Sequence, residues 1–351
     1  MREVLSDIDR WRAEGRAVAL ATVLQTWGSA PRGVGAKMAL TATGEITGSV
    51  SGGCVEGAVV EAGLQTLASG RPQLLNFGVA DETAWSVGLA CGGRIDVFVQ
   101  PLDPAMYEAV RIALVEDRAA AIATIVRGPA DWLGREMVLR DDGSAVGRLG
   151  DELDASALEL ARAGLAAGQS RLASLPSAAT EAVEVFVDVL LPSPTLVVVG
   201  GVHIAIALTS IAKTLGYRTI VIDPRRVFGS EVRFPHVDRL IQSWPDEAIQ
   251  EIGVTRSTAV VMLTHDPKID DPALLAVLPG PAFYVGALGS RKTQARRRER
   301  LLQAGLSEAH LDRLHAPVGL EIGAQTMEEI ALAVMAEVVQ TRNTLSIDRQ
   351  S

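Results

Sequence analysis

Apolar and polar positions recur in the same order twice along the first half of the chain. Each copy begins with a short apolar run typical of a buried strand, continues through a second strand to an Ala- and Leu-rich helical stretch, and closes on an alternating strand. The matching segments are 16–24 with 118–126, 38–48 with 137–147, 57–70 with 155–168, and 95–101 with 183–189. The pattern predicts two related halves, about 16–101 and 118–190, that share one sheet or pack with pseudo-symmetry.

From Thr195 onward the pattern changes to buried strands that alternate with helices. LVVVGG at 196–201 is a continuous apolar run that ends in a glycine turn, which is typical of a strand of a parallel sheet. A helix over 205–215 follows. We therefore expect an α/β protein, with an N-terminal α+β domain containing the internal repeat over 1–190 and a C-terminal Rossmann-like parallel-sheet domain over 191–351.

Length and composition agree with two domains and exclude several classes of protein. The 351 residues are 48% apolar and carry a net charge of −9, which excludes a disordered chain and disfavours a nucleic-acid binder. Two cysteines are too few for a disulfide framework, and the acidic start lacks an apolar signal region, so a cytoplasmic location is expected. Residues 189–212 carry no charged side chain, but prolines and glycines interrupt them, so no membrane span is expected.

Both cysteines adjoin a glycine pair, as GGC at 52–54 and CGG at 91–93. Glycine pairs let backbone N–H groups approach a ligand, so each thiol is expected on a nest-like loop. Cys54 is also expected just before a helix, whose dipole favours a thiolate. The second copy of the repeat has RLGDELDAS in place of the first of these loops and no cysteine. Both copies share the same strands and helix, but only the first has the loops with glycine pairs and cysteines. This difference indicates that the first copy carries the site.

The residues leave several roles open for this region. A thiolate pair can bind a soft metal centre, exchange disulfides or hold a sulfur-rich cofactor, whereas a single cysteine is more often a small apolar core residue. Glu56 can orient a ligand or solvate the first turn of the helix. Arg32 and Lys37 suit an anionic group or are ordinary solvated charges.

The second domain has an incomplete dinucleotide-binding pattern. Asp223 lies 23 residues after Gly200, near the ~20 expected of the carboxylate that binds a ribose hydroxyl. Val202 stands where a G-x-G motif needs its second glycine, which disfavours the close approach of a pyrophosphate and makes NAD(P) binding doubtful. His265 at a predicted strand end suits proton transfer, a metal or a turn, and Arg291 can meet a phosphate.

The chain resembles the XdhC/CoxI family, the accessory factors of xanthine dehydrogenase and related molybdenum hydroxylases. The motifs that carry the resemblance run in order over almost the whole chain: GSAPRGVGAKM, SGGCVEG, GLACGGRIDVFV, VVVGGVHIA, IDPR, LTHD, YVGALGSRK and HAPVGLEIGAQTMEEIA. The resemblance implies a cytosolic factor that binds molybdenum cofactor, protects it while its terminal sulfur ligand is installed, and delivers it to an apo molybdenum hydroxylase. It also implies a cysteine desulfurase as the sulfur donor.

Carried over to this sequence, the resemblance puts Cys54 and Cys91 on the family's cysteine positions, where they are candidate metal ligands. Val202 departs from the family's usual glycine, and Met327 stands where a proline often precedes the closing helix. The other candidate cofactor-binding residues are Arg32, Lys37, Gly52, Gly53, Glu56, Gly92, Gly93, Gly200, Gly201, His203, Asp223, Arg225, His265, Ser290 and Arg291.

Three functions compete on this sequence. The first is a maturation chaperone for molybdenum cofactor with no turnover of its own. The second is an NAD(P)-dependent oxidoreductase that uses the Rossmann-like domain, with His265 or the cysteine pair near the hydride. The third is thiol–disulfide exchange, which ranks last because 37 residues separate the two thiols. The client hydroxylase, the pterin or dinucleotide form of the cofactor and the number of chains, a homodimer included, stay open.

Overall fold

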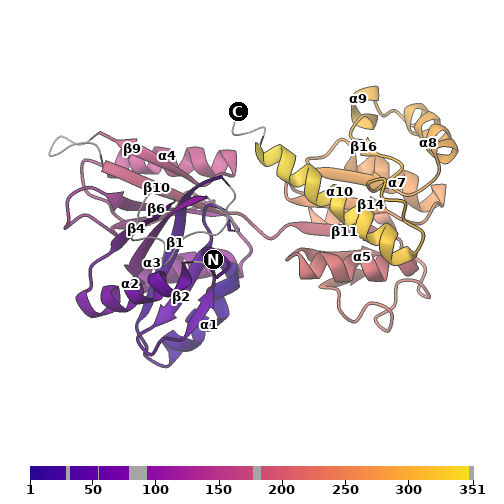
Figure 1. The fold of residues 1–351 in the computed structure, drawn as a ribbon. Coiled ribbons are helices and arrows are strands. Elements are labelled where there is room, and N and C mark those ends of the chain that lie inside the picture. Colours follow the sequence, from indigo (N-terminus) through magenta and orange to yellow (C-terminus); the bar gives the residue numbers. More distant parts are fainter. Residues whose placement is uncertain (29–31, 54, 79–92, 177–182, 348–351) are drawn as a thin grey trace. The chain divides into compact units, whose positions relative to one another are not determined.

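The computed structural model describes residues 1–28, 32–53, 55–78, 93–176 and 183–347. The chain divides into two compact units, Met1–Pro192 and Ser193–Ser351. The fold class expected from the sequence is confirmed, because the first unit is a duplicated α+β structure and the second contains a parallel sheet (Figure 1). Within the described residues, no helix is long and apolar enough to cross a membrane.

The first unit contains the same seven elements twice. The first repeat consists of α1 (Arg2–Ala13), β1 (Val18–Trp27), β2 (Lys37–Thr41), β3 (Ile46–Gly48), α2 (Glu56–Ser69), β4 (Gln73–Phe77) and β5 (Arg94–Pro101). The second repeat consists of α3 (Pro104–Val115), β6 (Ala120–Arg127), β7 (Glu136–Arg140), β8 (Ala145–Gly147), α4 (Asp154–Ala167), β9 (Arg171–Leu175) and β10 (Val183–Leu190). The sequence pattern missed α1, α3, β4 and β9, so each repeat is larger than predicted.

Each repeat forms its own antiparallel five-stranded sheet, in the orders β3-β2-β1-β5-β4 and β8-β7-β6-β10-β9. Of the two arrangements that the sequence left open, the structure therefore has separate sheets. Alternate residues of each strand face opposite sides, and α2 and α4 each cover one face of their own sheet. Leu24 and Phe98 of the first sheet meet Val126 and Phe186 of the second in a shared apolar cluster, so the sheets pack against each other.

Two buried polar pairs join the sheets at positions related by the repeat. The Lys37 ammonium lies 2.6 Å from the Asp188 carboxylate, and both side chains are at most 5% exposed. The Gln100 amide donates to the Glu136 carboxylate at 2.6 Å. When the strand registers of the two repeats are compared, Lys37 of the first repeat occupies the position of Glu136 in the second. In the same way, Gln100 occupies the position of Asp188. The same two places in the fold therefore hold different charges in the two repeats.

The second unit has a six-stranded sheet in the order β13-β12-β11-β14-β15-β16, with every neighbouring pair parallel. This order is the Rossmann order, in which the direction of winding reverses between the first and fourth strands. The elements are β11 (Thr195–Val199), α5 (His203–Thr214), β12 (Arg218–Ile222), β13 (Arg239–Ile241), α6 (Pro245–Ile252), β14 (Thr258–Met262), α7 (Pro267–Val277), β15 (Tyr284–Ala287), α8 (Arg291–Gln303), α9 (Glu308–Leu311), β16 (Leu314–His315) and α10 (Met327–Ile347).

Helices cover both faces of this sheet. Residues of α5 and α10 pack in one apolar cluster, and residues of α6, α7 and α8 pack in another on the opposite face. The closing helix begins with a reciprocal cap, since Thr326 Oγ1 accepts from the Glu329 N–H and the Glu329 carboxylate accepts from the Thr326 N–H. The spacing of these two residues is that of a capping box, so their role is structural.

Candidate functional site

The diglycine loop before α2 wraps around the carboxylate of Glu56. Oε1 and Oε2 of this residue accept hydrogen bonds from the backbone N–H groups of Ser51, Gly52 and Gly53 and from the hydroxyls of Ser49 and Ser51. Partial burial raises the pKa of Glu56, but the hydrogen bonds from the two serines and the backbone outweigh it and lower the pKa to about 2. The N–H groups of the nest-like loop, which the sequence suggested a ligand could approach, therefore bind a carboxylate of the chain itself.

The second repeat has a simpler version of this loop. Asp154 begins α4 as Glu56 begins α2, and its carboxylate accepts from the N–H groups of Leu149 and Gly150 at 2.7 and 3.0 Å. The first-repeat loop is one residue longer and ends in the segment GGC. Backbone N–H groups as far as Gly53, the residue before Cys54, therefore donate to the Glu56 carboxylate.

Arg32 and Lys37 have different surroundings. Arg32 donates to the backbone carbonyl of Ser49 at 3.2 Å and forms an ion pair with Glu3, which places it beside the diglycine loop. Lys37 is 3% exposed, begins β2 and binds Asp188 and the Thr22 hydroxyl. Its ammonium is thus already neutralised inside the sheet-to-sheet contact rather than displayed on a loop, a position that favours a structural role.

Cys54, Cys91 and Gly92 lie outside the described residues, so their predicted role as metal or cofactor ligands stays a prediction. Gly93 is described and buried. In the part of the chain that the structure describes, no group of three or more His, Cys, Asp or Glu side chains is arranged to hold a metal ion.

A cavity of about 450 Å³ lies where several strands of the first unit end. It is lined by Trp27 at the end of β1, by Asn76, Phe77 and Gly78 at the end of β4, by Arg94 and Asp96 at the start of β5, and by Arg127 at the end of β6. A volume of this size is typical of a site for a small molecule. Arg94 follows Cys91 by three residues in the sequence.

Sequence reasoning missed Trp27, Arg94 and Arg127 as functional candidates. They lie up to 100 residues apart in the sequence. Strand register joins Trp27 to Arg94, and the packing of the two sheets adds Arg127. The repeat offers a signal that could have found them. In the aligned sequences, the second repeat has Pro129 where the first has Trp27, and Ala182 in place of Arg94.

In the second unit, both glycines of the loop after β11 serve packing within the protein. A Cβ atom on Gly200, whose φ is +109°, would lie 2.4 Å from Cγ2 of Thr264, and one on Gly201 would lie 2.4 Å from the carbonyl oxygen of Phe228. The loop is therefore pressed between the segments that follow β12 and β14. Val202 precedes α5 in an extended conformation and gives the helix no side-chain cap.

The Asp223 carboxylate is saturated by donors of the chain itself. Oδ1 accepts from the backbone N–H and Nε of Arg225, and Oδ2 accepts from Nη2 of Arg225 and the N–H of Gly201. Asp223 is fully buried; burial raises its pKa, but these bonds lower it overall. Since a carboxylate has about four lone-pair positions, a ribose hydroxyl would have to displace Arg225. This geometry weakens the dinucleotide prediction.

The other candidates of the second unit lie near the carboxyl ends of its strands. His265 follows β14, is exposed and has a φ of +60°, a backbone conformation that is rare outside glycine. Its neighbour Asp266 caps α7 by accepting from the N–H of Lys268.

Ser290 caps α8, and Arg291 begins that helix in an exposed position. His203 is exposed, with Nε2 4.0 Å from the Glu328 carboxylate.

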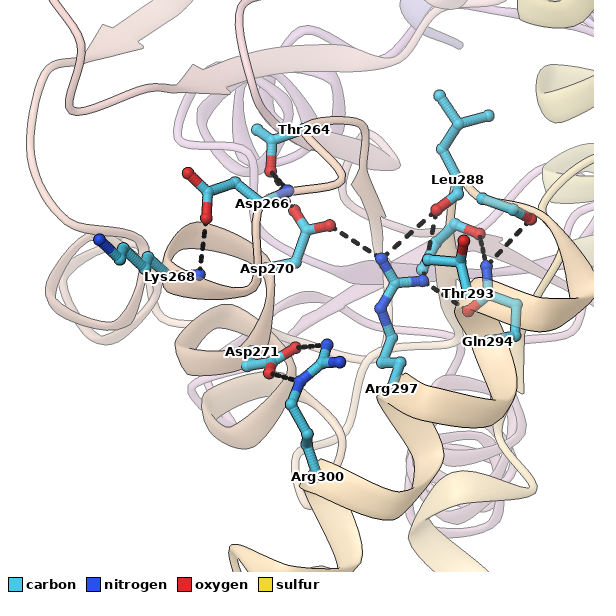
Figure 2. A network of polar contacts seen from close by, with 12 residues as sticks. Thr264, Asp266, Lys268, Asp270, Asp271, Leu288, Thr293, Gln294, Arg297 and Arg300 are labelled. Carbon is cyan, nitrogen blue, oxygen red and sulfur yellow. Dashed lines mark hydrogen bonds and ion pairs between the residues drawn. The ribbon is translucent and has the colours of Figure 1, made fainter.

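Residues 291–300 carry six basic side chains, and two of them lie in a contact between helices. Figure 2 shows Arg297 of α8 inserted between α7 and the turn after β15. Its guanidinium lies 2.9 Å from the Asp270 carboxylate, and both side chains are at most 2% exposed. Arg300 pairs with Asp271 in the same interface. These ion pairs fix α8 to α7, so Arg297 and Arg300 have a structural role.

A duplicated sheet unit with a cavity at its strand ends, followed by a Rossmann unit, defines a two-domain α/β class of protein. The chain belongs to the XdhC and CoxI family. The model described as "XdhC and CoxI family" matches residues 11–78 and 113–176, one segment in each repeat, and the model described as "XdhC Rossmann domain" matches 196–338.

Relatives resemble the chain over nearly its whole length. A Bacillus subtilis protein that is named as a probable xanthine dehydrogenase subunit is 29% identical over 337 residues, which are 93% of this chain and 94% of that protein. The Escherichia coli "Molybdenum cofactor insertion chaperone PaoD" is 27% identical over 93% of this chain and 84% of its own. A crystal structure from Bacillus halodurans, described as a xanthine dehydrogenase, is 22% identical and matches 97% of this chain and 96% of its own with a TM-score of 0.77, which shows a common fold.

Proposed function

We propose that this protein binds molybdenum cofactor and delivers it to an apo molybdenum hydroxylase of the xanthine dehydrogenase type. The observation that carries the proposal is the difference between the two repeats. The framework is built twice, yet the glycine-rich loop before Cys54 and two of the residues that line the cavity, Trp27 and Arg94, belong to the first repeat. The name of the relative PaoD supports the choice of cofactor.

The described residues suit this cargo. Molybdenum cofactor is an anionic pterin dithiolene, so its recognition calls for cations, ring contacts and soft sulfur ligands. Arg94 and Trp27 supply the first two, and Cys54 and Cys91 are the candidates for the third. In this proposal the thiols hold the metal or its sulfur while a cysteine desulfurase supplies the terminal sulfur. The protein itself turns over no substrate.

The proposal is tested by metal and pterin analysis of the full chain after co-expression with cofactor synthesis. Molybdenum and pterin should copurify with the wild type in equal amounts. Their retention should fall in the double variant Cys54→Ser, Cys91→Ser, and activity of the co-expressed hydroxylase should fall with it. Wild-type protein that carries neither molybdenum nor pterin would refute the proposal.

The oxidoreductase alternative has less support, because the carboxylate expected to hold a ribose is occupied by Arg225. A titration with NADH and NADPH distinguishes the two functions. The chaperone proposal expects no saturable binding at physiological concentrations, whereas tight binding with substrate-dependent loss of absorbance would favour the enzyme.

A further inference from the structure

The cavity at the strand ends of the first unit has one cation that the described residues leave without an acidic partner. Asp96 is 8% exposed, accepts from the Asn76 amide at 2.6 Å and lies 3.5 Å from Arg127. Arg127 is also paired with Glu184 at 2.8 Å. Among the described side chains, no carboxylate pairs with Arg94, which is exposed at the start of β5. Within the described residues, Arg94 is therefore the cation of this wall that has no carboxylate partner.

An aromatic ring lies beside that cation. The guanidinium carbon of Arg94 lies 6.0 Å from the centre of the Trp27 ring. Trp27 is 43% exposed, although most large apolar side chains of the chain are buried. Gly78 makes room for the arginine, because a Cβ atom there would lie 3.0 Å from Nε of Arg94. The cavity thus presents a flat ring and a planar cation on adjoining surfaces.

The second repeat serves as an internal control for this arrangement. By strand register, Ser174 and Leu175 correspond to Asn76 and Phe77. In the aligned sequences of the two repeats, Pro129 and Ala182 stand in place of Trp27 and Arg94. Asp96 and Glu184, which also correspond, both bind Arg127. The carboxylate is thus present in both repeats, whereas the aromatic ring of Trp27 and the guanidinium of Arg94 occur only in the first. Side chains required by the fold alone would be expected in both.

We propose that this cavity is a binding pocket for a planar heteroaromatic ring that carries a phosphate. The ring stacks on Trp27, and the phosphate accepts paired hydrogen bonds from Arg94, whose planar guanidinium matches two phosphate oxygens. Arg127 adds a second cation at the edge of the pocket. The identity of the ligand rests on the proposed function. A pterin phosphate has this chemistry, and so does the nucleotide end of a dinucleotide form of the cofactor.

Four probes separate the parts of this ligand in calorimetric titrations of the full-length protein. They are 6-hydroxymethylpterin, its monophosphate ester, inorganic phosphate and cytidine monophosphate. The phosphorylated pterin should bind at least tenfold more tightly than either the unphosphorylated pterin or phosphate. Equal or tighter binding of cytidine monophosphate would also support the pocket and would assign it to the nucleotide end. The absence of saturable binding for all four probes would overturn the proposal.

Substitutions assign the binding to these residues. Arg94→Gln should weaken binding of the phosphorylated probe about tenfold and leave the unphosphorylated pterin unchanged, whereas Trp27→Leu should weaken both pterins. Arg94→Lys keeps the positive charge but not the paired donors, so it should lose less affinity for the phosphorylated probe than Arg94→Gln does. The matched control is Arg71→Gln, which removes one exposed positive charge just before β4, at the end of that strand away from the cavity. Equal affinity in Arg94→Gln, Trp27→Leu and the control would overturn the proposal.

Failure of this pocket is distinguishable from failure of the proposed function. If wild type and Arg94→Gln carry equal molybdenum and pterin after co-expression, the pocket is refuted while the delivery function stands. If the probes bind as expected but the wild type never acquires molybdenum, the pocket stands and the delivery function is refuted. Unchanged thermal unfolding midpoints would confirm that the variants are folded, as expected for exposed side chains.

Discussion

The two repeats of the first unit share their elements and sheet order but differ in what those elements carry. Both repeats put a carboxylate at the start of the helix after the third strand, and both bring a polar pair into the contact between the sheets. Only the first has Trp27 and Arg94 at the strand ends and a loop long enough to enclose Glu56. The comparison shows that folding needs are met twice, whereas the groups suited to a ligand occur once.

The largest expected effect comes from the buried pair in which the repeats differ in charge. Lys37→Met leaves the Asp188 carboxylate buried without a cation and should lower the free energy of unfolding of the first unit by about 3–5 kcal/mol. Urea unfolding followed by tryptophan fluorescence reports on this unit, because four of the five tryptophans precede residue 192. The added substitution Asp188→Asn should recover most of the loss, and a loss below about 1 kcal/mol would show that water already screens the pair.

A second effect should be the same in both repeats. Gly48 and Gly147 have φ of +74° and +86°, and a Cβ atom on each would lie 2.3 or 2.4 Å from the carbonyl oxygen of Lys37 or Glu136. Alanine at either position should cost about 2–3 kcal/mol of unfolding free energy, with the two losses within about 0.5 kcal/mol of each other.

The controls for this pair lie in the neighbouring turns. Gly44 and Gly143 also have positive φ, but a Cβ atom there meets nothing within 4 Å. Alanine at these positions should cost only the conformational term, about 1 kcal/mol. Unequal losses at Gly48 and Gly147 would contradict the structural equivalence of the two repeats.

A smaller effect should separate the two helix-start carboxylates. Glu56→Ala removes the acceptor of a whole loop and should cost about 2 kcal/mol, whereas Asp154→Ala, with two backbone donors, should cost about 1 kcal/mol. Because the pKa of Glu56 is about 2 in the folded protein against an ordinary 4.5, its contribution is complete above pH 4.5 and is lost as the pH falls toward 2.

Urea unfolding of the full chain at pH 7 and pH 3 measures this contribution. Glu56→Gln should lose much of the acid sensitivity of the first unit while keeping the side-chain length. Equal pH dependence in Glu56→Gln and wild type would contradict the assignment of the low pKa to the loop donors.

The smallest expected effect is a gain in stability rather than a loss, and it concerns Glu136. Burial raises the pKa of Glu136 above its ordinary 4.5, against the hydrogen bonds of Gln100 and Thr124. The folded state therefore holds the proton more tightly than the unfolded chain, and stability falls as the pH rises above 4.5 through the folded pKa. Glu136→Gln should remove this loss and stabilise the first unit by about 1 kcal/mol at pH 7. Destabilisation at pH 7 would show that the ionised carboxylate is needed.

The sequence predicted the fold where apolar patterns are strong. The run at 196–201 is buried on both faces of its sheet and therefore shows as a continuous apolar segment. β4 was missed because QLLNF is short and at most partly buried along its length, so it shows no alternation. The helices α1 and α3 were missed because their sequences, REVLSDIDRWRA and PAMYEAVRIALV, have too little in common to reveal a repeat.

The site was harder to predict because its residues meet through strand pairing. Register alone joins Trp27 to Arg94, and the packing of the sheets brings Arg127 to them. Spacing placed Asp223 at the expected strand end, but it could not reveal that Arg225 binds the carboxylate. Lys37 looked like a loop cation because nothing local shows that its partner, Asp188, is 151 residues away.

The unlike pairs between the sheets make the two repeats obligate partners of each other. Two first repeats joined in the same way would bury Lys37 against Gln100 twice, with no carboxylate for either ammonium. Two second repeats would oppose Glu136 and Asp188, a carboxylate against a carboxylate. Neither half can therefore replace the other in a symmetric pair. The duplicated unit behaves as a heterodimer fused into one chain, which leaves its first half free to specialise while the second preserves the fold.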